Sequence, residues 1–166
     1  MNKKADIVFD MVPNGEKETI RVEWYDLVGC EIPDLKWKQV HIIANNDGKI
    51  VLPYFDNIKL HNLPGGHIEI GEDVEATIRR EFAEETGGTI IEWEPIGYQV
   101  RIDAEGKATY QLRVYAKVSG VKDAVVDYDG LHIPVNQYDI IEMIAILGWD
   151  NPVGKHIYEL VEKKFR

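Results

Sequence analysis

The chain has 166 residues, 45% apolar and 29% charged, which is typical of one globular domain and excludes a disordered or fibrous chain. Its single cysteine, Cys30, excludes a disulfide framework and a cysteine-based zinc cluster, and it favours a reducing, cytoplasmic setting. The net charge of −10 argues against nucleic acid and anionic membranes as partners, and we expect neither a targeting segment nor a membrane span.

The first half of the chain predicts two strand pairs followed by a loop and a helix. The four strands are expected over residues 5–12, 19–24, 39–45 and 49–52. The turns within the pairs are Pro13-Asn14-Gly15 and Asp47-Gly48, and an irregular segment over 26–37 separates the pairs. A glycine-rich loop is expected over 57–72. The helix is expected over 74–86, with Asp73 as its N-cap and Gly87 as a left-handed C-cap.

The second half predicts two longer strands and two helices. Strands are expected near 89–102 and over 109–118, and the second alternates apolar residues with Gln111, Arg113, Tyr115 and Lys117. This alternation predicts a half-buried strand with one polar face. Helices are expected over 138–147 and 154–165. The order of strands, helix, strands and helices indicates a mixed sheet with helices packed on it.

Three glutamates gather on the helix expected over 74–86. Glu81, Glu84 and Glu85 share an arc roughly 100° wide, and apolar side chains border that arc. Like charges at these spacings destabilise a helix by roughly 0.2–0.5 kcal/mol per pair, and desolvation beside apolar surface disfavours the charged form further. A divalent cation such as Mg²⁺ or Mn²⁺ removes both penalties. The alternative is an ordinary acidic helix face paired with Arg79 and Arg80.

A double glycine before this helix favours the metal interpretation. Gly65-Gly66 lets the backbone turn tightly and lets a peptide carbonyl reach a ligand. From Gly66 the sequence reads GHIEIGEDVEATIRREFAEETGG, which resembles the Nudix box, a loop–helix–loop signature of 23 residues. All seven fixed positions agree, and Phe82 supplies the required apolar residue. Gly88 departs from the usual aliphatic residue at the last position, which puts the packing of that turn in doubt.

The resemblance implies a fold, an activity and a set of site residues. The fold class would be α/β (α+β), a Nudix-like α/β/α sandwich with a mixed sheet over residues 38–166, and residues 1–37 would form an N-terminal β extension. The activity would be the metal-dependent hydrolysis of a diphosphate linkage in a nucleoside diphosphate-linked small molecule. The positions that match metal ligands are Gly65, Glu81, Glu84 and Glu85. The positions that match structural residues of the box are Gly66, Glu72, Arg80 and Gly87.

The proton acceptor and the substrate contacts are less closely defined. Within the box the base is Glu84 or Glu85, and outside it the segment 122–130 offers Asp127 and Asp129, unless that segment is an ordinary acidic turn. The cationic contacts for substrate phosphates are expected to be Arg101 and Arg113, the alternative being solvent-facing strand residues. His67 after the double glycine could also touch a phosphate.

The sequence leaves two functions and two substrate classes open. The first function is the Mg²⁺- or Mn²⁺-dependent enzyme, and the second is a non-catalytic nucleotide-sensing module, which could dispense with the two catalytic carboxylates. Markers of ADP-ribose, dinucleoside-polyphosphate and NADH hydrolases outside the box are absent, so a nucleoside triphosphate and a nucleotide-sugar-like substrate both stay open. The N-terminal strand pair resembles the additional sheet by which some ADP-ribose-type members form a homodimer.

Overall fold

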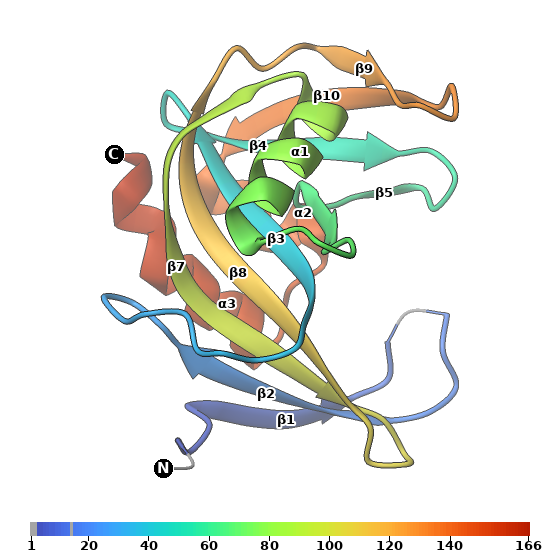
Figure 1. Cartoon of the computed structure of the whole chain (residues 1–166), viewed down its shortest axis with the longest axis vertical. Coiled ribbons are helices and arrows are strands. Elements are labelled where there is room, and N and C mark those ends of the chain that lie inside the picture. The colour runs from blue at the N-terminus through green and yellow to red at the C-terminus, as the bar shows by residue number, and fades with distance from the viewer. Residues whose placement is uncertain (1–2, 14) are drawn as a thin grey trace.

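The computed structural model describes residues 3–13 and 15–166 and contains a mixed sheet with helices on both faces (Figure 1). The strands of the first half are β1 (Ile7–Met11), β2 (Ile20–Asp26), β3 (Trp37–Asn46), β4 (Lys49–Phe55), β5 (Leu60–His61) and β6 (Gly65–His67). The strands of the second half are β7 (Thr89–Ile102), β8 (Ala108–Ser119), β9 (Ala124–Val126) and β10 (His132–Asp139). The helices are α1 (Val74–Thr86), η1 (Ile140–Glu142), α2 (Met143–Leu147), α3 (Pro152–Val161) and η2 (Glu162–Phe165).

The strand order across the sheet is β1-β2-β7-β8-β3-β4-β10-β9. Neighbours along it are antiparallel except β3 and β8, which are parallel over most of their length. β3 pairs with β4 only at Asn45 and Asn46, beside their turn, and pairs with the short strand β6 at residues 39–41. β3 and β4 therefore separate beyond their turn. The glycine-rich loop, through β6, pairs with the part of β3 that β4 does not contact.

Two apolar layers cover the faces of the sheet. Figure 1 shows α1 on the near face, where Ile78 and Phe82 are fully buried in one cluster with residues of β3, β7 and β8. On the far face, Val153 and Ile157 of α3 are buried in a second cluster with Trp24 and with residues of β3, β4 and β8. The mixed sheet between helices agrees with the predicted α/β/α sandwich.

The N-terminal strand pair belongs to the same sheet. β1 pairs with β2, and β2 pairs with β7 over residues 21–26, which confirms the strands expected over 5–12 and 19–24. Trp24 lies over Gly97 of β7, where a Cβ atom would come within 2.1 Å of the indole ring. Asn14 of the predicted turn lies outside the described residues. The boundary between an extension over 1–37 and a domain over 38–166 stays a prediction.

Four predictions about individual elements were wrong. The segment 57–72, expected to be a loop throughout, contains the two short strands β5 and β6. The helix expected over 138–147 is preceded by the missed strand β10, which includes Tyr138 and Asp139 and pairs with β4, so the α-helix covers only residues 143–147. The last helix begins at Pro152, two residues before its expected start, and its final turn is a 3-10 helix. The alternating face of β8 is not polar surface, because Gln111, Arg113 and Tyr115 are buried.

None of the helices in the described part of the chain has the length and apolar character that a membrane crossing requires.

Candidate active site

Helix α1 begins and ends where the sequence predicts. The Asp73 carboxylate accepts a hydrogen bond from the Ala76 amide at 2.7 Å, as an N-cap does. Gly87 has φ 68° and its amide donates to the Ala83 carbonyl, which is a left-handed C-cap. Since Ile78 and Phe82 hold one stripe of α1 against the sheet, the glutamates on the adjoining stripe lie at the border of the core.

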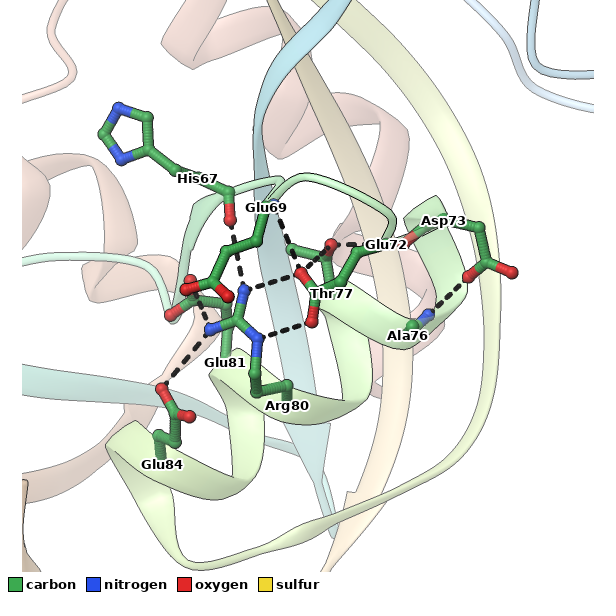
Figure 2. A network of polar contacts seen from close by, with 9 residues as sticks. All are labelled: His67, Glu69, Glu72, Asp73, Ala76, Thr77, Arg80, Glu81 and Glu84. Atoms are coloured by element: carbon green, nitrogen blue, oxygen red, sulfur yellow. Dashed lines mark hydrogen bonds and ion pairs between the residues drawn. The ribbon is translucent and has the colours of Figure 1, made fainter. Parts of the chain in front are cut away.

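Arg80 joins the glycine-rich loop to α1 (Figure 2). Its Nε and Nη2 donate to the two Glu72 oxygens at 2.6 and 2.8 Å, and Nη2 also donates to the His67 carbonyl at 3.1 Å. The arginine, with a smaller contribution from Thr77, lowers the pKa of Glu72 to about 2. This bidentate pair fixes the loop relative to the helix, the structural role implied for Glu72 and Arg80.

Arg80 also reaches two of the three glutamates on α1. Its Nη1 lies 3.0 Å from Glu81 Oε1 and 3.4 Å from Glu84 Oε2. The Glu81 carboxylate packs against the backbone of the loop, since a Cβ atom at Gly66 would lie 2.3 Å from Glu81 Oε1. Burial raises the pKa of Glu81 despite the arginine. Glu84 is about half exposed, at 48% of its side chain, and faces water.

Glu85 turns toward the other glycine of the pair. Its Oε2 accepts a hydrogen bond from the Gly65 amide at 2.9 Å. Burial raises the pKa of Glu85 to about 8, and the charges of Glu81 and Glu84 add to this shift. Gly65 has φ +148°, and a Cβ atom there would lie 2.2 Å from the Val40 carbonyl oxygen on β3. Only glycine therefore allows the loop to run this close to both β3 and Glu85.

The donor atoms fit a hard divalent cation, although they are not gathered around one point. Within residues 3–13 and 15–166 no three acidic, histidine or cysteine side chains converge into a ready metal-binding group. Arg80 instead neutralises Glu81 and Glu84, and the Gly65 amide stabilises Glu85. The Glu81 carboxylate packs against the backbone at Gly66, and the Glu85 carboxylate is desolvated. Both offer oxygen ligands of the kind that Mg²⁺ and Mn²⁺ select.

The residues around Gly88 explain why glycine stands at the last position of the box, where an aliphatic residue is usual. A Cβ atom there would lie 2.8 Å from the Phe82 ring and 3.0 Å from the Ser119 carbonyl oxygen. Its amide donates to the Thr86 hydroxyl at 3.1 Å. The turn after α1 therefore packs directly on β8 and leaves no space for the aliphatic side chain.

The acidic loop before β10 lies near the C-terminal end of α1. Asp127 is used within its own turn, where its carboxylate accepts from the Leu131 amide at 2.8 Å. Asp129 and Asp127 raise the pKa of Tyr128, and Glu84 also contributes to that shift. Val126 and His132, on either side of the loop, line one pocket with Glu84, so the loop lies beside the exposed glutamate. The assignment of Asp127 or Asp129 as the base stays a prediction, and Asp127 has a structural role already.

The predicted cationic contacts lie on the far face of the sheet from α1. Arg101 and Arg113 line one cavity of about 290 Å³ between β1, β7, β8 and the start of α3. Arg113 is only 6% exposed, so the solvent-facing alternative is wrong for this residue. The His67 side chain points away from the Arg80 guanidinium, although its carbonyl accepts from Arg80 Nη2 (Figure 2). On β6, His67 is opposite Gln39 of β3.

Sequence reasoning missed several residues of this region. His41 lies on β3 between Gly65 and Arg113, and burial lowers its pKa well below the ordinary value, with Arg113 and His67 contributing. A chain of amide side chains links β7, β8 and β3: it consists of Gln99, Gln111 and Gln39, joined at 3.3 and 2.5 Å. The sequence shows that these glutamines alternate with other residues along separate strands, but it does not show which glutamines pair with one another.

Comparison with known proteins identifies the family to which this arrangement belongs. The sequence model of the NUDIX domain matches residues 34–127, more than half of the chain. A search among curated proteins found no match.

Solved structures show the same fold at low sequence identity. The Bacillus subtilis pyrophosphohydrolase BsRppH is 15% identical with a TM-score of 0.70, over 94% of this chain and 97% of that one. A NUDIX hydrolase from Nitrosomonas europaea is 21% identical with a TM-score of 0.60, over 79% and 92% of the two chains. A MutT NUDIX hydrolase from Burkholderia pseudomallei is 21% identical with a TM-score of 0.57, over 76% and 99%.

Proposed function

This chain belongs to the Nudix family of pyrophosphohydrolases, and we propose that it cuts the diphosphate linkage of a small nucleotide-derived substrate with Mg²⁺ or Mn²⁺. The observation that carries the proposal is the pair of carboxylates packed against the two loop glycines. Glu81 lies against the backbone at Gly66, and Glu85 is bound to the Gly65 amide. Both carboxylates are held in a desolvated position that favours a cation partner.

The residues that would hold the cation are Glu81, Glu84, Glu85 and the carbonyl of Gly65. When bound, the cation neutralises the diphosphate oxygens and orients water for in-line attack. Glu72 and Arg80 keep the loop and the helix in one arrangement, and Glu84 would have to give up its contact with Arg80 to hold the cation. Since that contact is long, at 3.4 Å, and exposed, giving it up would cost little.

The water that attacks phosphorus must lose a proton to a carboxylate. Glu84 and Glu85 are our candidates, because neither is held by a short ion pair: Glu85 accepts from the Gly65 amide, and Glu84 has only the long contact with Arg80. Glu84 is open to solvent, whereas Glu85 has a raised pKa that suits proton transfer near neutral pH. Asp129 in the loop beside Glu84 is the alternative acceptor.

The test is turnover on a panel of diphosphate compounds with Mg²⁺, comparing nucleoside triphosphates with nucleotide sugars. We expect one class to be hydrolysed by the wild-type protein, and we expect a loss of at least about 100-fold in kcat for Glu85→Gln and Glu84→Gln. The matched control is Glu75→Gln, an exposed glutamate of the same helix that pairs with Arg79. Equal turnover in all three variants would refute the assignment, and no turnover on either class would favour the sensing function.

A further inference from the structure

A second cavity, of about 660 Å³, lies between the sheet and the segment that joins β2 to β3. Figure 1 shows this segment, residues 27–36, crossing the near face of β7 and β8 below α1. Leu27 and Leu35 of the segment pack in the same apolar cluster as α1. The residues that line the cavity come from the segment, from Lys3 and from β2, β7 and β8, whereas the proposed metal ligands lie on α1 and at Gly65. The cavity is therefore separate from the hydrolytic site.

The strand register places aromatic rings and one carboxylate around this cavity. Tyr25 of β2 is opposite Tyr98 of β7, and their rings stack 4.7 Å apart with planes 5° from parallel. In the next row on the same face, Glu23, Val100 and Tyr110 stand side by side on β2, β7 and β8. Val100 thus forms a low floor between a carboxylate on one side and a phenol ring on the other.

The tyrosine rings are held in place and stay uncharged. Trp37 packs edge-on against Tyr98 and Tyr110, with ring centres 5.3 and 6.4 Å away. Burial and the hydrogen bond to Glu23 raise the pKa of Tyr25 to about 12, and burial also raises the pKa of Tyr98. A fixed aromatic wall with a few placed polar groups is typical of a small-molecule site, and the faces of such rings attract cations.

The Glu23 carboxylate has room for a further donor. Its Oε2 accepts from the Tyr25 hydroxyl at 2.7 Å, and its Oε1 accepts from Arg21 Nε at 2.8 Å. The Tyr25 hydroxyl, with a smaller contribution from Arg21, lowers the pKa of Glu23, so the group is ionised at neutral pH. A carboxylate offers about four lone-pair sites, and these two contacts leave about half of them free.

The charges around the cavity favour a positive ligand. Glu31, at the rim, is exposed and adds a second carboxylate to Glu23. The one ammonium in the lining, that of Lys3, lies 3.7 Å from the Asp6 carboxylate. The phosphates of a nucleotide would meet these carboxylates, whereas the net charge of −10 attracts cations to the protein.

We propose that this cavity binds a small organic cation, in which an ammonium or amidinium group is attached to an apolar or flat body. The charged group binds the free lone pairs of Glu23, and the body packs on Val100 and on the tyrosine rings. A cavity of this volume encloses a whole small molecule, so the ligand is a free compound rather than a side chain of another protein. This binding function is additional to hydrolysis and does not rest on it.

The first experiment compares cations with neutral compounds of the same shape, in EDTA. Benzamidine is paired with benzamide, and choline is paired with 3,3-dimethylbutan-1-ol. ¹H–¹³C NMR of the tyrosine rings measures binding, and Tyr25→Phe and Tyr110→Phe assign the signals. We expect saturable shifts of Tyr25 and Tyr110, and in at least one pair the cation should bind at least about fivefold more tightly. No saturable shift with either cation, or equal binding within both pairs, would overturn the proposal.

The second experiment tests the carboxylates. Glu23→Gln should weaken binding of the cation about 5- to 20-fold without changing binding of its neutral partner, and Glu31→Gln should weaken it about two- to threefold. The matched control is Glu105→Gln, an exposed glutamate in the turn between β7 and β8, which should bind as the wild type does. Thermal melting checks that each variant folds, and if Glu23→Gln does not, the exposed Glu31→Gln decides. Unchanged affinity in the folded variants contradicts the proposal.

Two further titrations separate this site from the hydrolytic one. Glu85→Gln should bind the cation as the wild type does, so a failure of the proposed hydrolysis leaves this result standing. AMP, a flat ring that carries a phosphate, should not shift Tyr25 and Tyr110 at concentrations that saturate the cation. If AMP binds at these tyrosines more tightly than either cation, the cavity is a nucleotide site and the inference is wrong.

Discussion

Metal binding to this protein is expected to displace a proton from Glu85, so its affinity for Mg²⁺ should depend steeply on pH. In the metal-free protein the pKa of Glu85 is about 8, because burial disfavours its charged form. Only the ionised carboxylate binds a cation, and its fraction falls about tenfold for each pH unit below 8. At pH 6 about 1% is ionised, so affinity should be about 100-fold weaker than at pH 9, where most of the group is ionised.

Isothermal titration calorimetry with Mg²⁺ or Mn²⁺ between pH 6 and 9 measures this dependence. Titrations in buffers of different ionisation enthalpy report the number of protons released, which we expect to approach one at pH 6.5. Glu85→Gln should lose most of the affinity and the Glu85 part of the slope, whereas Glu75→Gln should keep both. An affinity that stays constant from pH 6 to 8, with no proton release, would refute the argument that Glu85 is a desolvated ligand.

Three further predictions follow from the geometry. In EDTA, the free energy of unfolding should fall as the pH rises from 4.5 to about 8, because the folded state holds the Glu85 proton that the unfolded state releases; urea denaturation should show a flatter profile in Glu85→Gln. Gly66→Ala should weaken metal binding by about 10- to 100-fold, because the new Cβ displaces the Glu81 carboxylate, while a flexible side-chain end can move with little change in Tm. Gly97→Ala should destabilise the protein by about 1–3 kcal/mol, because the new Cβ meets the Trp24 ring at 2.1 Å; an unchanged urea midpoint would contradict this.

The sequence predicted the active-site helix more closely than any other element. Its N-cap Asp73 and C-cap Gly87 are local signals, since each acts on backbone groups within four residues. The crowding of Glu81, Glu84 and Glu85 also follows from helical spacing alone. The sequence offered pairing of this acidic face with Arg79 and Arg80 as the alternative to a metal site, and Arg80 does hold Glu81 and Glu84 in the metal-free structure.

The polar face of β8 was misinterpreted because burial is decided by partners far along the chain. Gln111 and Arg113 alternate with apolar residues as solvent-facing side chains do, yet both are buried, and Arg113 lines a cavity together with residues of β1 and α3. The Gln111 side chain is hydrogen-bonded to Gln99 and Gln39 on two neighbouring strands. No local sequence pattern predicts such pairing.

β10 was missed for a different reason. It contains Pro134, which argues against a central strand, and it pairs with β4 at the position of another proline, Pro53. The strand tolerates both because β9 and β4 each pair with only part of it. Its last residues, Tyr138 and Asp139, were therefore assigned to the helix that follows.

The walls of the Arg113 cavity come from parts of the chain that the Nudix box does not include. Residues of β1 form one side, and the segment after α2 forms another. The glutamates that we propose as cation ligands, by contrast, all lie on α1, beside the glycine-rich loop. Sequence changes within the N-terminal strand pair can therefore reshape this cavity without altering α1 or the loop that packs on it.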